Sequence, residues 1–166
     1  MHGANATGRP FTGDYAGVLL YRTLHDFGFA SGPESRSRDD GLKLLDCRIA
    51  NAVRCLPPEN KPLTEEVNNC NRYLKDEMAG RNAPRLIIAL GGIAHRAVLK
   101  ARNLKLSAYT FGHGQEHQLG AELTLIDSYH CSRYNTQTKR LTAAMFQGIF
   151  RRARQLLDNS GHGNEA

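Results

Sequence analysis

The sequence predicts an α/β fold with three layers, α/β/α, around a mostly parallel central sheet. Two short apolar runs, at 86–90 and 123–127, have the length and composition of buried strands. Apolar residues at helical spacing fill the intervals between and around them, and strands that alternate with helices favour a parallel sheet with helices on both faces. At 166 residues with 40% hydrophobic content, the chain is long enough for one core. We expect one domain at 1–158 and a flexible tail at 159–166.

Each element has a local signal. Asp14 stands where the N-cap of a helix is expected, before apolar residues at helical spacing, and Gly28 stands where that helix stops. Thr64 and two glutamates begin another helix, which Gly80 ends. The expected helices are 16–27, 64–78, 93–101 and 142–157, and the expected strands are 48–53, 86–90 and 123–127. Residues 55–64, with three prolines, and the segment 109–117 are expected to be loops.

Composition limits the class of protein. The net charge of +6 and the pI near 9.4 favour a polyanionic partner, although such a charge also serves solubility. No stretch approaches the ~20 apolar residues of a membrane span, and no signal peptide is recognisable. We expect a cytoplasmic protein without membrane contact. Its four cysteines are then free, catalytic or metal-binding rather than paired in disulfides.

The segment 128–142, SYHCSRYNTQTKRLT, is the richest in polar side chains. It joins the strand at 123–127 to the last helix, and six basic residues but no acidic one occur between Ser128 and Leu157. A loop at a strand end that is rich in donors and carries a histidine suits an anionic or polar ligand. The alternative is a solvated surface loop.

Candidate site residues meet at one edge of the predicted sheet, because ligands bind beyond the carboxyl ends of parallel strands. Strand ends supply Asn51, the Gly91-Gly92 turn and His130, and the glycine-rich segment at 2–17 brings Phe11 and Asp14 if it folds over the same edge. An aromatic ring, an amide, a histidine and a carboxylate can together hold a flipped base and break its glycosidic bond. Each has a plainer interpretation: Phe11 in the core, Asp14 as a helix cap, Asn51 as a strand-end residue and His130 as a loop histidine.

Five motifs then stand in the order found in uracil-DNA glycosylases, and the chain resembles the family-5, or type B, branch of the iron–sulfur members. The motifs are GRPFTGDYAG (8–17), NAVRCLPPENKP (51–62), IIALG (87–91), FGHG (111–114) and YHCSRYNTQTKRLT (129–142). The resemblance implies a monofunctional hydrolase that releases uracil, and in this branch other deaminated bases, from double-stranded DNA at the start of base-excision repair. We expect it to act as a monomer.

The resemblance also implies roles for single residues. Phe11 corresponds to the ring that stacks on the flipped base, Asp14 to the carboxylate that activates water, and Asn51 to the amide that reads the pyrimidine edge. His130 corresponds to the histidine beside the uracil O2. The residues that the resemblance places in or along the DNA groove are Arg133, Asn135, Thr136, Lys139 and Arg140.

The iron–sulfur members hold a [4Fe–4S] cluster with four cysteines. Cys55 and Cys70 match two of these ligands, and the other two precede GRPFTGD in relatives. Cys47 and Cys131 are poor substitutes, which we interpret as small buried residues. Because Met1 begins inside the first motif, we expect an N-terminally truncated or mis-started chain that lacks the first strand and has an incomplete cluster site.

Two other functions remain open from the sequence. One is a damaged-DNA-binding remnant that has lost catalysis. The other is a Rossmann-like nucleotide-binding protein, which the Gly91-Gly92 turn suggests but which lacks a GxGxxG motif.

Overall fold

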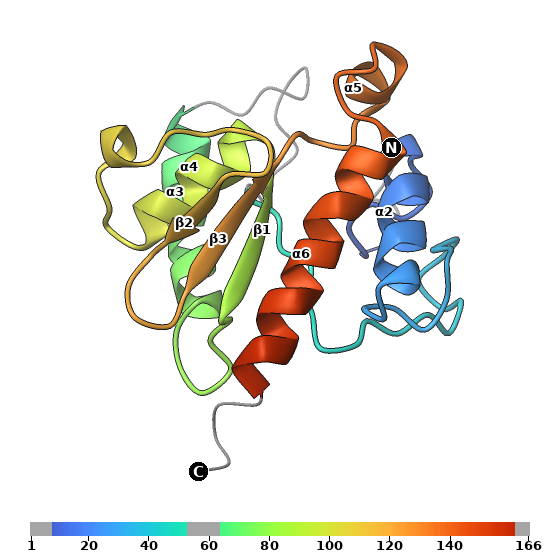
Figure 1. The fold of residues 1–166 in the computed structure, drawn as a ribbon, viewed down its shortest axis with the longest axis horizontal. Coiled ribbons are helices and arrows are strands. Elements are labelled where there is room, and N and C mark those ends of the chain that lie inside the picture. The colour runs from blue at the N-terminus through green and yellow to red at the C-terminus, as the bar shows by residue number, and fades with distance from the viewer. Residues whose placement is uncertain (1–7, 53–63, 162–166) are drawn as a thin grey trace. The chain divides into compact units, whose positions relative to one another are not determined.

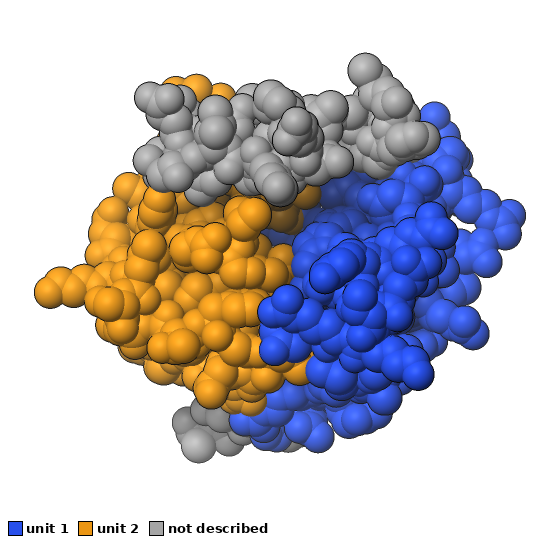
Figure 2. Space-filling view, turned by 90° about the horizontal axis from the view of Figure 1, so that it is seen from above, with its two compact units in different colours: residues 1–49, 129–166 blue, residues 50–128 orange. Residues whose placement is uncertain are grey.

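The computed structural model describes residues 8–52 and 64–161. It divides the chain into two compact units, which Figure 2 colours separately. Unit 1 combines residues 1–49 with residues 129–166, and unit 2 is the continuous segment 50–128. Among the described residues, no helix is long and apolar enough to cross a membrane.

Unit 2 contains a three-stranded sheet with the order β1-β3-β2 (Figure 1). β1 (Leu86–Leu90) pairs in parallel with β3 (Thr124–Ser128), with Leu86 opposite Thr124 and Leu90 opposite Ser128. β2 (Glu116–Gln118) pairs with β3 in the antiparallel direction. β3 is the central strand, and four of its five residues are buried.

Two helices of unit 2 lie on the same side of this sheet in Figure 1. α4 (Gly92–Ala101) follows β1 directly and contacts it, and α3 (Thr64–Glu77) packs against α4. Gly91 makes the strand-to-helix turn with a φ of 94°, which glycine adopts without strain. The shared core of this unit consists of Met78, Ala89, Val98, Leu99, Ala101, Leu119, Leu123 and Leu125.

Unit 1 is built on two helices that contact each other, α2 (Tyr15–Asp26) and α6 (Ala143–Gly161). Phe146, Ile149, Phe150 and Ala153 follow helical spacing along α6 and are all buried, so they form one apolar face. Phe29, after α2, packs edge-on against Phe150 with ring centroids 6.4 Å apart. Two shorter helices complete the described elements: η2 (Leu106–Ala108) in unit 2 and α5 (Arg133–Gln137) in unit 1.

The α/β class expected from the sequence is confirmed, and the helices and two of the strands lie within a few residues of their predicted positions. The described sheet is mixed, because β2 forms within the predicted loop 109–117 and runs antiparallel to β3. The strand expected at 48–53 is wrong for residues 48–52, which have no regular structure. A strand needs a partner, and none of the described strands pairs with these residues, of which Asn51 is exposed. α6 extends to Gly161, into the expected tail.

Candidate functional site

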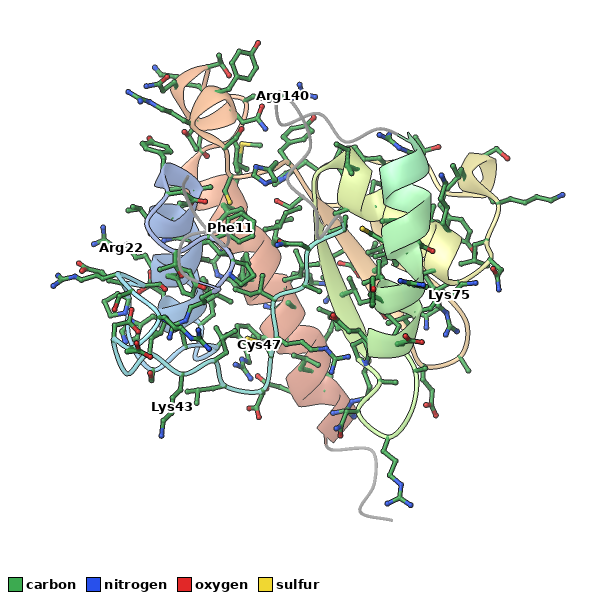
Figure 3. The ribbon with its side chains drawn as sticks, turned by 180° about the vertical axis from the view of Figure 1, so that it is seen from behind. Phe11, Arg22, Lys43, Cys47, Lys75 and Arg140 are labelled. Carbon is green, nitrogen blue, oxygen red and sulfur yellow. The ribbon has the colours of Figure 1, made fainter. Side chains whose placement is uncertain are left out.

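The segment GRPFTGD forms a tight turn before α2 and holds Phe11 in an unusual backbone conformation. Phe11 has a φ of 59°, in the left-handed region that bulky residues rarely occupy. Its ring lies 5.8 Å from the ring of His130, measured between centroids, at an interplanar angle of 37°. Figure 3 shows Phe11 beside α2. Strained residues of this kind cluster at binding sites, where the surrounding structure must fix them.

Gly17 makes this turn possible. A Cβ atom at residue 17 would lie 1.7 Å from the carbonyl oxygen of Phe11, far inside any contact distance. The first turn of α2 can therefore approach the Phe11 backbone only because residue 17 has no side chain. This explains the glycine in TGDYAG without reference to a ligand.

Hydrogen bonds from later parts of unit 1 anchor the turn. Arg9 donates through Nη1 to Asp40 Oδ1 at 2.7 Å and to Ser35 Oγ at 3.0 Å, and through Nη2 to the carbonyl oxygen of residue 38 at 2.9 Å. The Arg9 guanidinium is the main reason that the pKa of Asp40 is held well below its usual range. From the other side, the Tyr21 hydroxyl donates to the Pro10 carbonyl oxygen at 2.7 Å. After Phe11, the Thr12 and Ser35 hydroxyl oxygens lie 2.7 Å apart, at hydrogen-bond distance, so the chain is held on both sides of Phe11.

Asp14 is the N-cap of α2, as its position in the sequence predicts. Its Oδ1 accepts a hydrogen bond from the Gly17 backbone N–H at 2.7 Å. Within the described part of the chain, Oδ2 of Asp14 receives no hydrogen bond. The cap therefore fixes the orientation of the carboxylate through Oδ1.

His130 follows β3 by two residues and completes this group in unit 1. Burial lowers its pKa below the ordinary value of 6.5, and the negative charge of Asp14 opposes that shift in part. The Asn135 side-chain amide donates to the His130 carbonyl oxygen at 2.8 Å and fixes the loop behind the ring. The imidazole is thus held neutral near pH 7, and a neutral imidazole can donate one N–H. Phe11, Asp14 and His130 lie together in unit 1.

The polar loop after His130 contains the short helix α5, which the sequence did not predict. Ser132 caps it, with its Oγ accepting from the Asn135 N–H at 3.4 Å. Thr136 Oγ1 donates to the Ser132 carbonyl oxygen at 3.2 Å. The side chains of Asn135 and Thr136 thus form hydrogen bonds with the backbone of their own loop, and these bonds account for both polar residues without a ligand.

Three exposed cations surround α5. Arg133 lies 5.8 Å from the Tyr15 ring centroid, and Arg140 lies 4.7 Å from that of Tyr129. Lys139 has a φ of 57° at the turn that follows α5. Figure 3 labels Arg140 near this helix. The arrangement presents positive charge to solvent in and after α5, in the loop that follows His130.

Asn51 belongs to unit 2 and is exposed. The structure describes the two units individually, so the role of Asn51 in reading a base stays a prediction.

The burial and contacts of the cysteines bear on the iron–sulfur cluster that the sequence suggests. Cys55 lies outside the described residues, and Cys70 is buried on α3. In unit 1, Cys47 donates to the Phe29 carbonyl oxygen at 3.3 Å, and burial raises its pKa. Burial also raises the pKa of the fully buried Cys131 thiol to about 12. The Cys47 thiol is thus bonded to a carbonyl oxygen and Cys131 has no exposed surface, which agrees with their interpretation as structural residues.

Sequence reasoning missed one polar group, a buried carboxylate between two histidines in unit 2. Asp127 on β3 accepts from His95 on α4 at 2.8 Å and from His117 on β2 at 2.9 Å. The signal was an aspartate at the end of an otherwise apolar strand. Burying a carboxylate costs free energy unless it is paired or hydrogen-bonded. The two histidines gave no comparable signal, because β2 was predicted to be a loop.

Comparisons with known proteins agree with the motifs. The family profile described as "Uracil DNA glycosylase superfamily" matches residues 1–154. The chain is 46% identical over 155 residues to the type-5 uracil-DNA glycosylase of Thermus thermophilus, and the aligned region covers 93% of this chain and 70% of that protein. It is 41% identical over 152 residues to the type-5 uracil-DNA glycosylase of Pyrobaculum aerophilum, with 92% of this chain and 66% of that protein covered.

A more distant relative is the type-4 uracil-DNA glycosylase of Pyrobaculum aerophilum, 34% identical over 127 residues, or 74% of this chain and 57% of that protein. Identity is thus higher to the type-5 than to this type-4 protein, and it extends over nearly the whole chain. The chain belongs to the uracil-DNA glycosylase superfamily, in its type-5 branch.

Proposed function

We propose that this chain hydrolyses the N-glycosidic bond of uracil in DNA and leaves an abasic site. The observation that carries the proposal is the group in unit 1: the strained Phe11, the half-buried ring of His130 and the capping carboxylate of Asp14. Type-5 and type-4 relatives named as uracil-DNA glycosylases support it.

Each member of the group has a chemical task in this reaction. The Phe11 ring offers a face on which an extruded base can stack. Departure of uracil builds negative charge on the base, and the neutral His130 imidazole can donate an N–H to an oxygen that gains that charge. The sugar gains oxocarbenium character in the same step, and the second oxygen of Asp14 can stabilise that charge and orient water toward the sugar carbon.

The finer parts of the proposal concern the substrate and the assembly. The chain is proposed to act on double-stranded DNA as a cytoplasmic monomer, to accept other deaminated bases besides uracil, and to read the pyrimidine edge with Asn51. The exposed cations Arg133, Lys139 and Arg140 are proposed to contact the DNA backbone, with Asn135 and Thr136 shaping the loop that carries them. Release of uracil and of hypoxanthine from duplex and single strands, together with size-exclusion chromatography, tests these statements.

Asp14→Asn separates chemistry from folding. Asparagine caps helices about as well as aspartate, so the hydrogen bond to Gly17 is retained while the charge is lost. Because a positioned acid–base group contributes about 10²- to 10⁴-fold to rate, single-turnover uracil excision should slow by at least about 10²-fold. DNA affinity should change little. A variant with the wild-type rate would remove Asp14 from the reaction.

Arg140→Ala tests the proposed DNA contacts of the exposed cations, and its expected effect is the reverse of that of Asp14→Asn. It should weaken duplex binding and reduce the slope of log affinity against log salt by about 1, with a smaller effect on the single-turnover rate at saturating enzyme. Arg22→Ala is the matched control, since Arg22 is an exposed arginine that projects outward from α2 in Figure 3. Equal losses in both variants would mean that Arg140 contributes only general charge.

The same assays separate an enzyme from a DNA-binding remnant. The remnant would bind duplex DNA in a salt-dependent manner and release no base, whereas the proposed enzyme yields alkali-sensitive abasic sites. The names of the relatives do not favour the remnant.

Cys55 and Cys70 are proposed to supply two ligands of a [4Fe–4S] cluster. The support is their match to the cluster cysteines of the family and the burial of Cys70 on α3. Iron and sulfide analysis of the purified 166-residue chain should find less than a stoichiometric cluster. A stoichiometric cluster would show that Cys47 or Cys131 takes part, contrary to their interpretation as structural residues.

A further inference from the structure

The buried His95–Asp127–His117 group of unit 2 plays no part in the proposed excision reaction. Its members come from three elements, α4, β3 and β2. Asp127 has no exposed side-chain surface, and the side chains of His95 and His117 are 3% and 10% exposed. One ligand atom from each residue lies within 4.8 Å of the other two.

The polar atoms of the three side chains are directed at one another. Asp127 Oδ1 lies 2.8 Å from His95 Nδ1, and Asp127 Oδ2 lies 2.9 Å from His117 Nε2. On its other side, His95 Nε2 lies 3.1 Å from the Tyr109 carbonyl oxygen, which accepts its hydrogen bond. Two imidazoles and a carboxylate from three elements are thus gathered in one buried place.

The donor set suits a metal ion. Two imidazole nitrogens and a carboxylate form a ligand set of the kind that Zn²⁺ takes from proteins, with a fourth position left for water or the second carboxylate oxygen. Ligands at about 2.0–2.1 Å from one tetrahedral Zn²⁺ lie roughly 3.4 Å apart. The observed separations of 2.8 and 2.9 Å would have to widen by about half an ångström, which is within the reach of side-chain rotation.

The surroundings resemble the outer shell of a metal site. Metal-ligating histidines commonly donate their other N–H to a backbone carbonyl, as His95 does to Tyr109. The Gly112 N–H lies 3.4 Å from Asp127 Oδ2. Aromatic rings pack edge-on against both imidazoles, Phe111 against His95 at 5.6 Å and Tyr109 against His117 at 5.7 Å between centroids. These contacts fix the ring orientations before any ion binds.

We propose that His95, His117 and Asp127 bind one divalent metal ion, with zinc the best match, and that the ion ties α4 and the β2–β3 hairpin together. None of the three residues is a cysteine or a member of the proposed excision group, so either proposal can fail without the other.

Titration of the metal-free chain tests the site directly. The 166-residue protein, freed of metal by a chelator, should take up one equivalent of Zn²⁺ in competition with a chromophoric chelator, and its melting temperature should rise with Zn²⁺. Uptake of Co²⁺ should give a visible d–d spectrum without the strong near-ultraviolet absorption of a cobalt–thiolate bond. Absence of uptake, or a thiolate spectrum, would overturn the proposal, because the ion would then be missing or bound by cysteines.

Single variants locate the ion. His117→Gln changes the least buried of the three residues and should weaken Zn²⁺ binding by at least about 10-fold. His95→Gln should do the same and should also lose most of the thermal shift that Zn²⁺ gives. His25→Gln, an exposed histidine on α2 in unit 1, is the control and should bind like wild type. Wild-type affinity in both site variants would show that the ion binds elsewhere in the chain and would overturn the proposal.

Discussion

Gly17→Ala is a sharp test of how the site is built, because the same substitution normally stabilises a helix. Alanine in a helix interior is favoured over glycine by about 1 kcal/mol. At residue 17, however, the new Cβ would lie 1.7 Å from the Phe11 carbonyl oxygen and 2.9 Å from its carbon, and real Cβ contacts essentially never fall below 3.0 Å. The obstacle is backbone, which no side-chain rotation can remove.

The magnitude follows from that overlap. The Phe11 carbonyl has to retreat from 1.7 Å to at least 3.0 Å, although the bonds of Arg9 and Pro10 before it and of Thr12 after it hold the chain in place. Overpacking costs about 1–3 kcal/mol and more in severe cases, so the gain in helix propensity is outweighed and a net loss of about 2 kcal/mol is expected. A shift of about 1 Å in Phe11 should also slow excision by roughly 10²-fold.

Gly148→Ala is the matched control for this prediction. Gly148 lies inside α6 of the same unit, and a Cβ there would meet no atom within 4 Å. It should stabilise the protein by about 0.5–1 kcal/mol in urea unfolding and leave the single-turnover excision rate unchanged. If Gly17→Ala matched Gly148→Ala in both stability and rate, the close approach of α2 to Phe11 would be refuted.

Two further predictions concern pH. Because burial lowers the pKa of His130 in the folded protein, the unfolded chain takes up that proton first, so wild-type stability should fall as the pH drops below about 6.5. His130→Asn should lose less stability over the same interval, and equal losses in urea unfolding at pH 7 and pH 5 would contradict a depressed pKa. The pKa of Asp40 is lowered in the folded protein, mainly by Arg9. Asp40 therefore stabilises the fold at pH values above its ordinary pKa of 3.8, and this stabilisation is lost as the pH falls further. Asp40→Asn should therefore melt below wild type at pH 7 but converge with it in acid, whereas the exposed control Asp39→Asn should follow wild type throughout.

The sequence predicted elements well where one strong local signal was enough. Asp14 before apolar residues at helical spacing located α2 and its cap, and the run at 86–90 located β1. Residues 48–52 also look like a strand, but a strand forms only where another can pair with it, and the sequence of the segment alone does not show its partners. β2 was missed because its three residues carry no strand pattern of their own and become a strand only by pairing with β3.

The candidate site was predictable in its residues but not in its construction. The motifs identified Phe11, Asp14 and His130, and the structure places all three in unit 1. The left-handed backbone of Phe11 and the bonds from Arg9 to residues 35–40 depend on distant parts of the chain, which no local pattern encodes. The histidine–aspartate group escaped notice because its three members are brought together only by the fold.

The division of unit 1 into two separate stretches of sequence affects how the protein is made. A ribosome delivers Phe11 and Asp14 early, then all of unit 2, and only afterwards His130 and α6. Unit 2 is continuous and holds its own core, so its folding can start while the nascent chain is still growing. The Phe11–His130 contact closes a very long loop and therefore belongs among the last and slowest events of folding. A chain released before residue 130 would hold the core of unit 2 but would lack His130 of the proposed group.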